Sequence, residues 1–292
     1  MAANPSAKKS RWPSKSDGPC YDRGMFGLDH KIPIIEPALY AGGYTHIDFD
    51  GTDPRARDPL VRLESVGVAY ESHHARTDGG NWPYHRPIAG ARKDMWLRKT
   101  AAENLAHVNM RLAPFGAELF VLDGYRPIEC QRGLWDFFYE EAARTIPGAT
   151  PGDCRSYALD HVFDPAPFAP ADPSTWPAHA CGASVDLTLR DLASHELFDM
   201  GVRFEDICPV SANDYFEREL GAGRIAHDDR RLWNRRLVHW AMSAEGFLND
   251  PFVFWHYDWG NQLYIKVRNA LFADAPKAAW YGYIGSPQPN SS

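Results

Sequence analysis

The sequence predicts an α+β fold, because segments with helix and strand periodicity follow one another in mixed order and include a candidate hairpin. Apolar residues recur at helical spacing over residues 94–113 and 128–145. Apolar and polar residues alternate over 183–191, which indicates a strand. Gly260-Asn261 lies between two apolar runs and predicts a two-residue hairpin turn. This order favours α+β over a doubly wound parallel sheet, in which helices would separate the strands.

The first half of the chain contains four predicted segments. Residues 28–92 are rich in Gly, Pro, Asp and His and are expected to form loops and short strands. The helix over 94–113 is followed by a short apolar strand over 117–122. Pro127 stands at a suitable first position for the helix over 128–145, because its missing N–H is not needed there.

The second half begins with a segment that regular structure cannot include. Five prolines between residues 163 and 177 remove backbone donors and fix the chain direction. After the strand described above, Asp228 is a suitable N-cap for a helix that ends at Gly246. The apolar runs over 252–259 and 262–267 are expected to form the two strands of the hairpin.

The composition is that of an ordinary soluble globular protein, with 44% hydrophobic and 24% charged residues. A net charge of -7 gives no electrostatic reason to expect nucleic acid or an anionic membrane as a partner. No stretch approaches the roughly 20 apolar residues of a membrane span. The oligomeric state is left open by the sequence.

The cysteines and the N-terminus predict a cytoplasmic protein. The cysteines are odd in number and form no CxxC pair, which argues against a disulfide framework or a cysteine-based zinc site. They are Cys20, Cys130, Cys154, Cys181 and Cys208. No continuous apolar run follows the basic N-terminus, so a secretory signal is not expected. Residues 1–20 are expected to be disordered or loosely attached, and residues 21–292, which contain no repeat or clear linker, to form a single domain.

The segment HACGASVDLTL contains the first candidate for chemistry. Asp186 is flanked by apolar residues in a predicted strand, so its charge needs a salt-bridge partner or a metal. His179 precedes it, and Gly182 between them lets the backbone turn so that both side chains can converge. One Asp oxygen and two imidazole nitrogens are a standard catalytic zinc set, with a position open for water.

A second histidine, His256, lies in the aromatic run FVFWHYDW. The two-residue period of a strand places Phe254, His256 and Asp258 on one face. Two titratable residues on one face of so apolar a strand indicate a polar cavity. A hydrogen-bonded His–Asp pair is nevertheless commoner than a pair of ligands, and any one of the 12 histidines of the chain is more often a core residue.

The segment DGYRP, at a predicted strand-to-helix turn, is the second candidate. Arg126 projects from the end of a buried strand, where its planar fork can reach a carbonyl oxygen or a carboxylate. The alternative is an ion pair with Asp123 that only closes the turn. The spacing favours neither interpretation.

Four segments in order resemble the zinc D-alanyl-D-alanine dipeptidases, the family that includes the vancomycin-resistance dipeptidase and is related to zinc D,D-carboxypeptidases. LFVLDGYRP is similar to a strand that ends in the GYRP turn, and HACGASVDLTL to the zinc motif HxxGxAxD. DMGVRFED is similar to the MGxxFD segment, and FWH after Pro251 to the closing motif EWWH. Singly these matches are weak, but four in register, over roughly residues 90–267, make a fairly specific resemblance.

The resemblance implies a metal site, a fold and a substrate class. His179, Asp186 and His256 would ligate one zinc ion. The implied fold is a compact α+β domain with a central, mostly antiparallel sheet flanked by helices. The implied activity is zinc-dependent hydrolysis of a dipeptide or a related small amide.

The resemblance also implies roles for three further residues. Arg126 would stabilise the tetrahedral intermediate, a task suited to a fixed cation aimed at a developing oxyanion. Glu205, which stands where the family has an aspartate, would lie near the substrate's amino group, and Tyr125 would contribute to substrate binding.

Besides Glu205, the chain departs from the family pattern at several positions. Val253 stands where the family has the glutamate that acts as general base, and removing such a base typically costs ~10²–10⁴-fold in rate. Pro177 replaces a serine, so a substrate contact is expected to be lost, and Ser184 replaces an alanine. Asp258 is the best replacement base by strand parity, but it could equally orient His256.

Three functions therefore compete. The first is a zinc hydrolase with Asp258 or another carboxylate as base. The second is a metalloenzyme on the same scaffold that performs a non-hydrolytic reaction, such as a lyase, cyclase or transfer reaction on an amino-acid derivative. The third is a non-catalytic homologue that only binds a ligand.

Overall fold

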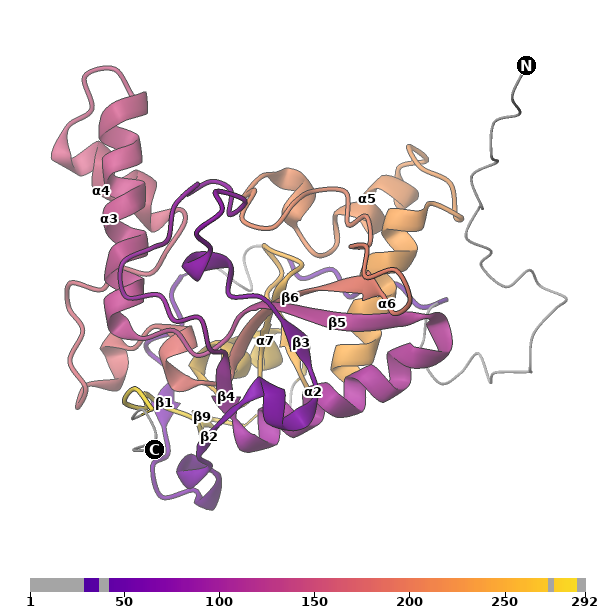
Figure 1. The fold of residues 1–292 in the computed structure, drawn as a ribbon, viewed down its shortest axis with the longest axis horizontal. Helices are drawn as coiled ribbons and strands as arrows, with labels where there is room; N and C mark the ends of the chain where they lie inside the picture. The colour runs from indigo at the N-terminus through magenta and orange to yellow at the C-terminus, as the bar shows by residue number, and fades with distance from the viewer. Residues whose placement is uncertain (1–28, 37–41, 273–275, 288–292) are drawn as a thin grey trace, which may run out of the picture.

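The computed structural model describes residues 29–36, 42–272 and 276–287. Its centre is a five-stranded sheet in the order β3-β5-β6-β8-β7 (Figure 1). The strands are β3 (Ala69–Tyr70), β5 (Ala117–Asp123), β6 (Ser184–Asp191), β7 (Leu248–Asn249) and β8 (His256–Asp258). Strand β3 runs parallel to β5 and the other neighbours pair antiparallel. This is the mostly antiparallel sheet of the expected α+β fold.

The described helices surround this sheet, and two short strand pairs lie outside it. The helices are α2 (Lys99–Leu112), α3 (Ile128–Thr145), α4 (Pro151–Leu159), α5 (Tyr215–Gly221), α6 (Arg230–Ala244) and α7 (Gln262–Leu271). Strands β2 (Leu60–Arg62) and β4 (Trp96–Arg98) pair antiparallel, and β1 (Asp48–Phe49) and β9 (Ala278–Ala279) pair parallel. Within the described ranges no helix is long and apolar enough to cross a bilayer.

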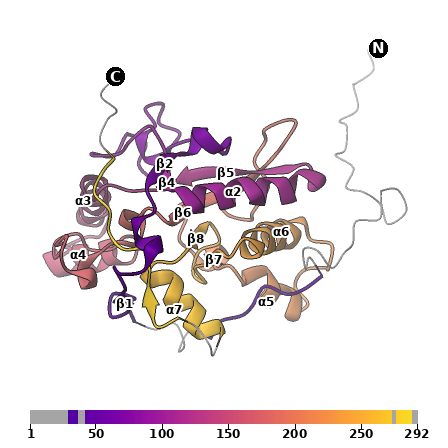
Figure 2. The same ribbon diagram turned by 90° about the horizontal axis from the view of Figure 1, so that it is seen from below.

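One face of the sheet is the core of the molecule. Helices α2 and α6 cover it, as Figure 2 shows from below. In β6 the alternate residues Val185, Leu187 and Leu189 point into this core and are fully buried. Because side chains alternate along a strand, Asp186 and its neighbours of the same parity must point to the opposite face.

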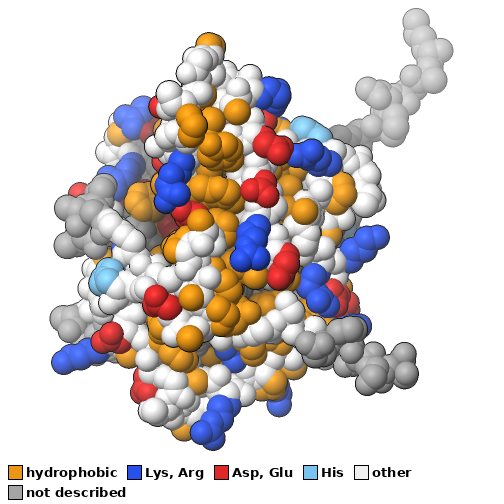
Figure 3. Space-filling view, turned by 90° about the vertical axis from the view of Figure 1, so that its left-hand side faces the viewer, with side chains coloured by type: hydrophobic (Ala, Val, Ile, Leu, Met, Phe, Trp, Pro, Cys, Tyr) orange, Lys and Arg blue, Asp and Glu red, His pale blue; other side chains and the backbone are white. Residues whose placement is uncertain are grey.

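The opposite face is crossed by irregular segments and short 3-10 turns, chiefly residues 71–95 and 197–212 (Figure 1). Helices α3 and α4 stand at one end of the sheet and form a separate apolar cluster with Tyr84 and Ile88. Figure 3 shows this end, where hydrophobic side chains form a band between charged ones. Loops rather than helices therefore cover the face that carries Asp186.

Several elements confirm the sequence predictions. The structure has the predicted helix over 128–145 and a strand over 184–191. The predicted strand over 117–122 extends by one residue to Asp123. The helix expected after Asp228 is present as α6 (Arg230–Ala244), but the predicted N-cap is wrong, because it is the Asp229 side chain that accepts a hydrogen bond from the Arg231 N–H. The expected N-terminal segment lies outside the described residues, and the assignment of 21–292 to one domain stays a prediction.

The predicted hairpin is wrong. Residues 262–267 belong to helix α7, because the Asn261 side chain accepts a hydrogen bond from the Tyr264 N–H and caps the helix. Asn is a good N-cap as well as a good turn residue, so Gly-Asn does not distinguish the two structures. The strand expected over 252–259 is only three residues long, His256–Asp258.

Two further differences concern the helices. The helix expected over 94–113 begins at Lys99, because the residues before it form β4 and pair with β2. Helices α4 and α5 were not predicted. Helix α4 has a capping box formed by Thr150 and Asp153, a signal that the sequence does contain.

Arg98 joins three parts of the chain near the turn that precedes β6. Its side chain is buried and donates to the carbonyl oxygens of Cys181 (2.9 Å) and Gly282 (3.0 Å). It also donates to the carbonyl oxygens of Ala56 (3.1 Å) and Asp58 (2.6 Å). Arg98 thus holds the turn around Cys181 against the N-terminal and C-terminal segments.

We expect Arg98→Met to lower the free energy of unfolding by about 3 kcal/mol or more, because each buried carbonyl left without a donor costs about 1–3 kcal/mol. Urea unfolding followed by tryptophan fluorescence measures the loss. Arg86→Met, which changes an arginine whose side chain is 60% exposed, is the control and should unfold like the wild type. Equal stability of the two variants would contradict the bridging role of Arg98.

Candidate metal centre

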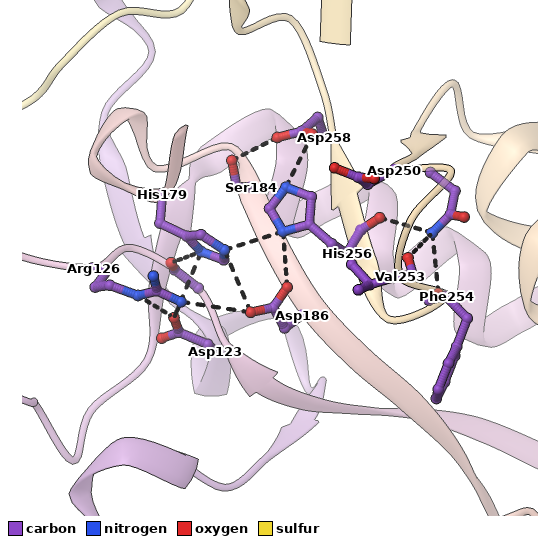
Figure 4. Close-up of polar contacts among 12 residues, drawn as sticks. Asp123, Arg126, His179, Ser184, Asp186, Asp250, Val253, Phe254, His256 and Asp258 are labelled. Carbon is purple, nitrogen blue, oxygen red and sulfur yellow. Dashed lines mark hydrogen bonds and ion pairs between the residues drawn. The ribbon is translucent and has the colours of Figure 1, made fainter. Parts of the chain in front are cut away.

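The structure brings His179, Asp186 and His256 together on the face of the sheet that loops cover. One ligand atom from each lies within 4.8 Å of the others, and all three residues are buried. The His256 Nδ1 is 2.9 Å from Asp186 Oδ1, and the His179 Nε2 is 3.4 Å from Asp186 Oδ2. The two rings meet edge to face, with 3.2 Å between His179 Nε2 and His256 Nδ1 (Figure 4).

Strand register and one glycine create this convergence. Strands β6 and β8 pair so that Asp186 lies directly opposite His256. His179 lies on a 3-10 turn (Ala178–Cys181) that ends at Gly182, whose φ is +75°. A Cβ at Gly182 would lie 2.5 Å from the Leu60 side chain, so this left-handed, crowded position requires glycine. The turn that the sequence predicted at Gly182 is confirmed.

The outer nitrogen of each ring has an acceptor that fixes the ring. The His179 Nδ1 is 2.8 Å from the Gly124 carbonyl oxygen, which can only accept, so this nitrogen carries the proton. The His256 Nε2 is 3.0 Å from Asp258 Oδ2. The inner nitrogens, His179 Nε2 and His256 Nδ1, therefore lie beside one carboxylate, where each can give its lone pair to a cation once the ring is neutral. Such a donor set needs a cation at its centre, and it fits a zinc ion.

Opposite charges within the cluster shift the pKa values of His256 and Asp186. Burial lowers the pKa of His256, but Asp258 and Asp186 outweigh it and hold that pKa well above its usual value. Burial raises the pKa of Asp186, but His179 and His256 outweigh it and hold that pKa below its usual range. The cluster stabilises positive charge among its ligand atoms, which a divalent cation can supply in place of a proton.

Asp258 lies on the side of the His256 ring that faces away from Asp186. Its Oδ2 faces the outer nitrogen of His256, and its Oδ1 accepts hydrogen bonds from Ser184 Oγ (2.6 Å) and Asn261 Nδ2 (2.6 Å). Both oxygens are therefore occupied on the side of the ring away from Asp186. Of the two roles weighed for Asp258, this placement favours the orientation of His256 over proton abstraction.

Arg126 lies next to the three candidate ligands. It donates to Asp123 Oδ2 from Nε (2.8 Å) and to Gln131 Oε1 from Nη1 (3.0 Å). Its Nη2 is also 3.7 Å from Asp186 Oδ2. Both interpretations of DGYRP thus find support, because Arg126 pairs with Asp123 and still presents a fixed cation beside the cluster. Burial opposes this charge, but Asp123 and Asp186 raise the pKa of Arg126 above its usual value.

A β-bulge places Asp123 on this face. Leu119 and Val121 of the same strand point into the core, so uninterrupted alternation would bury Asp123 there as well. The register shifts between Val121 and Asp123, which then lies opposite Asp186. An extra residue in one strand re-aims the side chains that follow it.

His74 links Asp123 to Glu205. Its side chain is 1% exposed, with Nε2 3.1 Å from Glu205 Oε1 and Nδ1 3.6 Å from Asp123 Oδ2. Burial lowers the pKa of His74, but Asp123 and Glu205 outweigh it and raise that pKa to about 9. His74 is therefore cationic at neutral pH, and the two carboxylates beside it are its counter-ions.

The remaining predicted residues lie at different distances from the cluster. Glu205 joins it only through His74, and its φ of +69° is unusual for a residue other than glycine. The Tyr125 hydroxyl turns to the C-terminal segment, where it is 3.1 Å from the Ile284 carbonyl oxygen. Val253 lies on the turn before β8 and packs, half-buried, against the apolar core (Figure 4).

Sequence reasoning missed two contributors to the site. His74 lies in a segment without periodicity, so no local pattern distinguished it from the other histidines. Asn261, interpreted as a turn residue, both caps α7 and donates to Asp258. Only the side-chain contacts, which join distant parts of the chain, show these roles.

We expect Asp258→Ala to weaken zinc binding about 10–100-fold, the typical effect of removing a group that orients a ligating histidine. Competition with a chromogenic chelator measures the affinity. Asp228→Ala, which removes an exposed carboxylate, is the control and should bind zinc like the wild type. Unchanged affinity in Asp258→Ala would show that His256 does not need this partner.

The family model described as D-ala-D-ala dipeptidase, Peptidase_M15, matches residues 89–274. The D-alanyl-D-alanine dipeptidase of Synechocystis sp. is 30% identical over 236 residues, which cover 78% of this chain and 92% of that protein. That of Enterococcus faecalis is 23% identical over 192 residues, 65% of this chain and 85% of that protein. The solved structure of VanYB in complex with D-Alanine-D-Alanine is 15% identical, covers 65% of this chain and 85% of its own, and has a TM-score of 0.35. The chain belongs to the peptidase M15 family of D-alanyl-D-alanine dipeptidases.

Proposed function

We propose that this protein is a zinc-dependent hydrolase of a dipeptide or a related small amide, with one zinc ion held by His179, Asp186 and His256. One observation carries the proposal: the His179 and His256 rings each direct one nitrogen toward the same carboxylate, that of Asp186. The other nitrogen of each ring is hydrogen-bonded to an acceptor on the far side. The relatives named D-alanyl-D-alanine dipeptidase support the substrate class.

The zinc ion and the residues around the candidate ligands would have separate roles in the reaction. Bound zinc would polarise a carbonyl group and lower the pKa of water. Arg126, fixed by Asp123 and Gln131, is placed to stabilise negative charge that develops on the reacting carbonyl oxygen. Asp258 would keep the His256 ring in the orientation and tautomer that ligation needs.

We infer that this chain lacks the usual general base. Position 253 is a valine, which cannot accept a proton. The carboxylates that surround the candidate ligands are engaged elsewhere: Asp123 with Arg126, Glu205 with His74, and Asp258 with His256. A hydrolase of this kind would work below the rate of one that keeps its base, by ~10²–10⁴-fold.

The same observation favours a second candidate, a metalloenzyme that performs a non-hydrolytic reaction on an amino-acid derivative. Such an enzyme would keep the ligands and Arg126 but would gain from losing the group that activates water. A homologue that only binds its ligand would be the third outcome, with metal and ligand bound but no turnover.

The predicted cytoplasmic location rests on the sequence. Four cysteines are described, all of them unpaired, and Cys130, Cys154 and Cys181 are buried. Unpaired cysteines are in keeping with a reducing compartment, which we propose as the site of action.

We expect the purified protein to bind one zinc ion per chain and to cleave members of a panel of dipeptides and N-acyl amino acids. Elemental analysis measures the metal, and amine release measures turnover. Removing zinc with a chelator should abolish cleavage, and adding it back should restore it. Zinc binding without cleavage of any panel member would refute the hydrolase and leave the other two candidates.

We expect Val253→Glu to raise the kcat for dipeptide hydrolysis about 10-fold or more, because a positioned base contributes ~10²–10⁴-fold. Val253→Gln, which has nearly the same shape but cannot act as a base, is the matched control and should leave kcat unchanged. An equal change in both variants would assign the effect to packing, and no change in either would show that position 253 is too far from the reaction.

A further inference from the structure

A cavity of about 390 Å³ is lined by residues of β5 and β6, by the loop that carries Phe204, and by Phe254 and Trp255. Four of its lining residues are chain neighbours, or same-face neighbours on a strand, of residues already assigned to the site. The pairs are Leu122 with Asp123, Thr188 with Asp186, Phe204 with Glu205 and Trp255 with His256. Thr188 lies two residues along β6 from Asp186 and on the same face, so one wall of the cavity reaches the face that carries the metal centre. The size of the cavity is that of a small-molecule pocket.

The walls of the cavity are mainly apolar. Phe204 and Trp255 meet edge to face, with ring centroids 5.5 Å apart, and Leu122 and Met200 continue the apolar lining. The charged lining residues Asp199 and Arg203 are exposed. A group bound against these walls would gain free energy mainly by removing apolar surface from water.

One buried arginine holds the loop that forms the outer wall. Arg235 of α6 is fully buried and donates to the carbonyl oxygens of Met200 (2.7 Å), Val210 (2.9 Å) and Ala212 (3.1 Å). These three residues flank the loop segment that carries Phe204. Because its ends are held by hydrogen bonds from a charged side chain, the wall exists before any ligand binds.

Glu205, the carboxylate next to the cavity-lining Phe204 in the chain, already has a cation beside it. Glu205 lies directly after Phe204 in the chain, and its Oε1 is 3.1 Å from the buried His74. Other charged or titratable groups near His74 are Asp123 and Arg126 on β5 and its turn, His73 on the same 3-10 turn, and Tyr84, whose ring centroid is 5.5 Å from that of His74. With Asp123 and Glu205 beside it, His74 keeps its charge, so a substrate ammonium at Glu205 would place two cations together.

We propose that the substrate is an amide whose acyl side is apolar and carries no free ammonium, and that this acyl group binds in the cavity between Phe204 and Trp255. The proposal rests on the hydrolytic function proposed above and names its substrate class as N-acyl amino acids. The His74–Glu205 pair disfavours a substrate ammonium, and the apolar walls favour an aliphatic acyl group in its place.

Three substrates test the proposal in the zinc-loaded full chain. D-alanyl-D-alanine and N-propanoyl-D-alanine have nearly the same shape and differ by the ammonium, and N-hexanoyl-D-alanine extends the acyl chain. We expect kcat/KM for the propanoyl compound to exceed that for the dipeptide about 10-fold or more. Each added methylene should raise kcat/KM further, by about 4-fold, as burial of one CH₂ group predicts. A preference for the free dipeptide would overturn the proposal while leaving the hydrolase intact.

A matched pair of variants locates the acyl site. Leu197 lines the cavity and Leu192, on the same segment, does not; they are 58% and 45% exposed. Leu197→Trp should fill the cavity and remove the advantage of hexanoyl over propanoyl, whereas Leu192→Trp should keep it. Equal behaviour of the two variants would overturn the placement of the acyl group.

Equilibrium binding keeps the proposal testable if no amide is cleaved. Calorimetry with the same three compounds and the zinc-loaded protein should then give Kd values in the same order, with the hexanoyl compound tightest. Binding in this order without cleavage would support the substrate class and refute the hydrolase. Tightest binding of the free dipeptide, or no dependence on chain length, would overturn the proposal.

Discussion

The antiparallel pairing of β6 with β8 is the constraint on which the candidate site depends. It places Asp186 directly opposite His256, and the hydrophobic core on the other face keeps it there. A slip of one residue would turn Val185 or Leu187 to the site and bury Asp186 among apolar side chains. The cost of burying that carboxylate, together with the lost apolar burial, fixes the register. The same packing that stabilises the sheet therefore sets the distance between two candidate metal ligands.

Buried charge on this face is balanced by contacts that leave few groups uncommitted. Asp258 faces His256, and a second series of contacts runs from Arg126 through Asp123 and His74 to Glu205. Burial of a charge is costly unless it is paired and hydrogen-bonded, so each group restrains the next. A scaffold for metal binding and for charge stabilisation follows from this arrangement. Val253, at the position of the family glutamate, adds no carboxylate to this arrangement.

The fold could be predicted where local periodicity was long and unambiguous. The helix over 128–145 and the strand of β6 follow from the spacing of their apolar residues. The segment over 262–267 could not be assigned in this way, because a short apolar run suits a strand or a helix equally. The hydrogen bond from the Tyr264 N–H to the Asn261 side chain decided for the helix. Short strands such as β4 depend on a partner strand, so local pattern does not reveal them.

The sequence by itself determined the residue types, the family and the three candidate ligands, because the motifs that carry them are short and local. The tertiary structure decided which side chains contact one another. It turned Asp258 to the outer nitrogen of His256, and it placed His74 between two carboxylates although no pattern marks it. It also formed a mainly apolar cavity from four separate segments, one of them the strand that carries Asp186. Periodicity reports which way a side chain points along one element, whereas a site is made of contacts between elements far apart in the chain, and only packing specifies those.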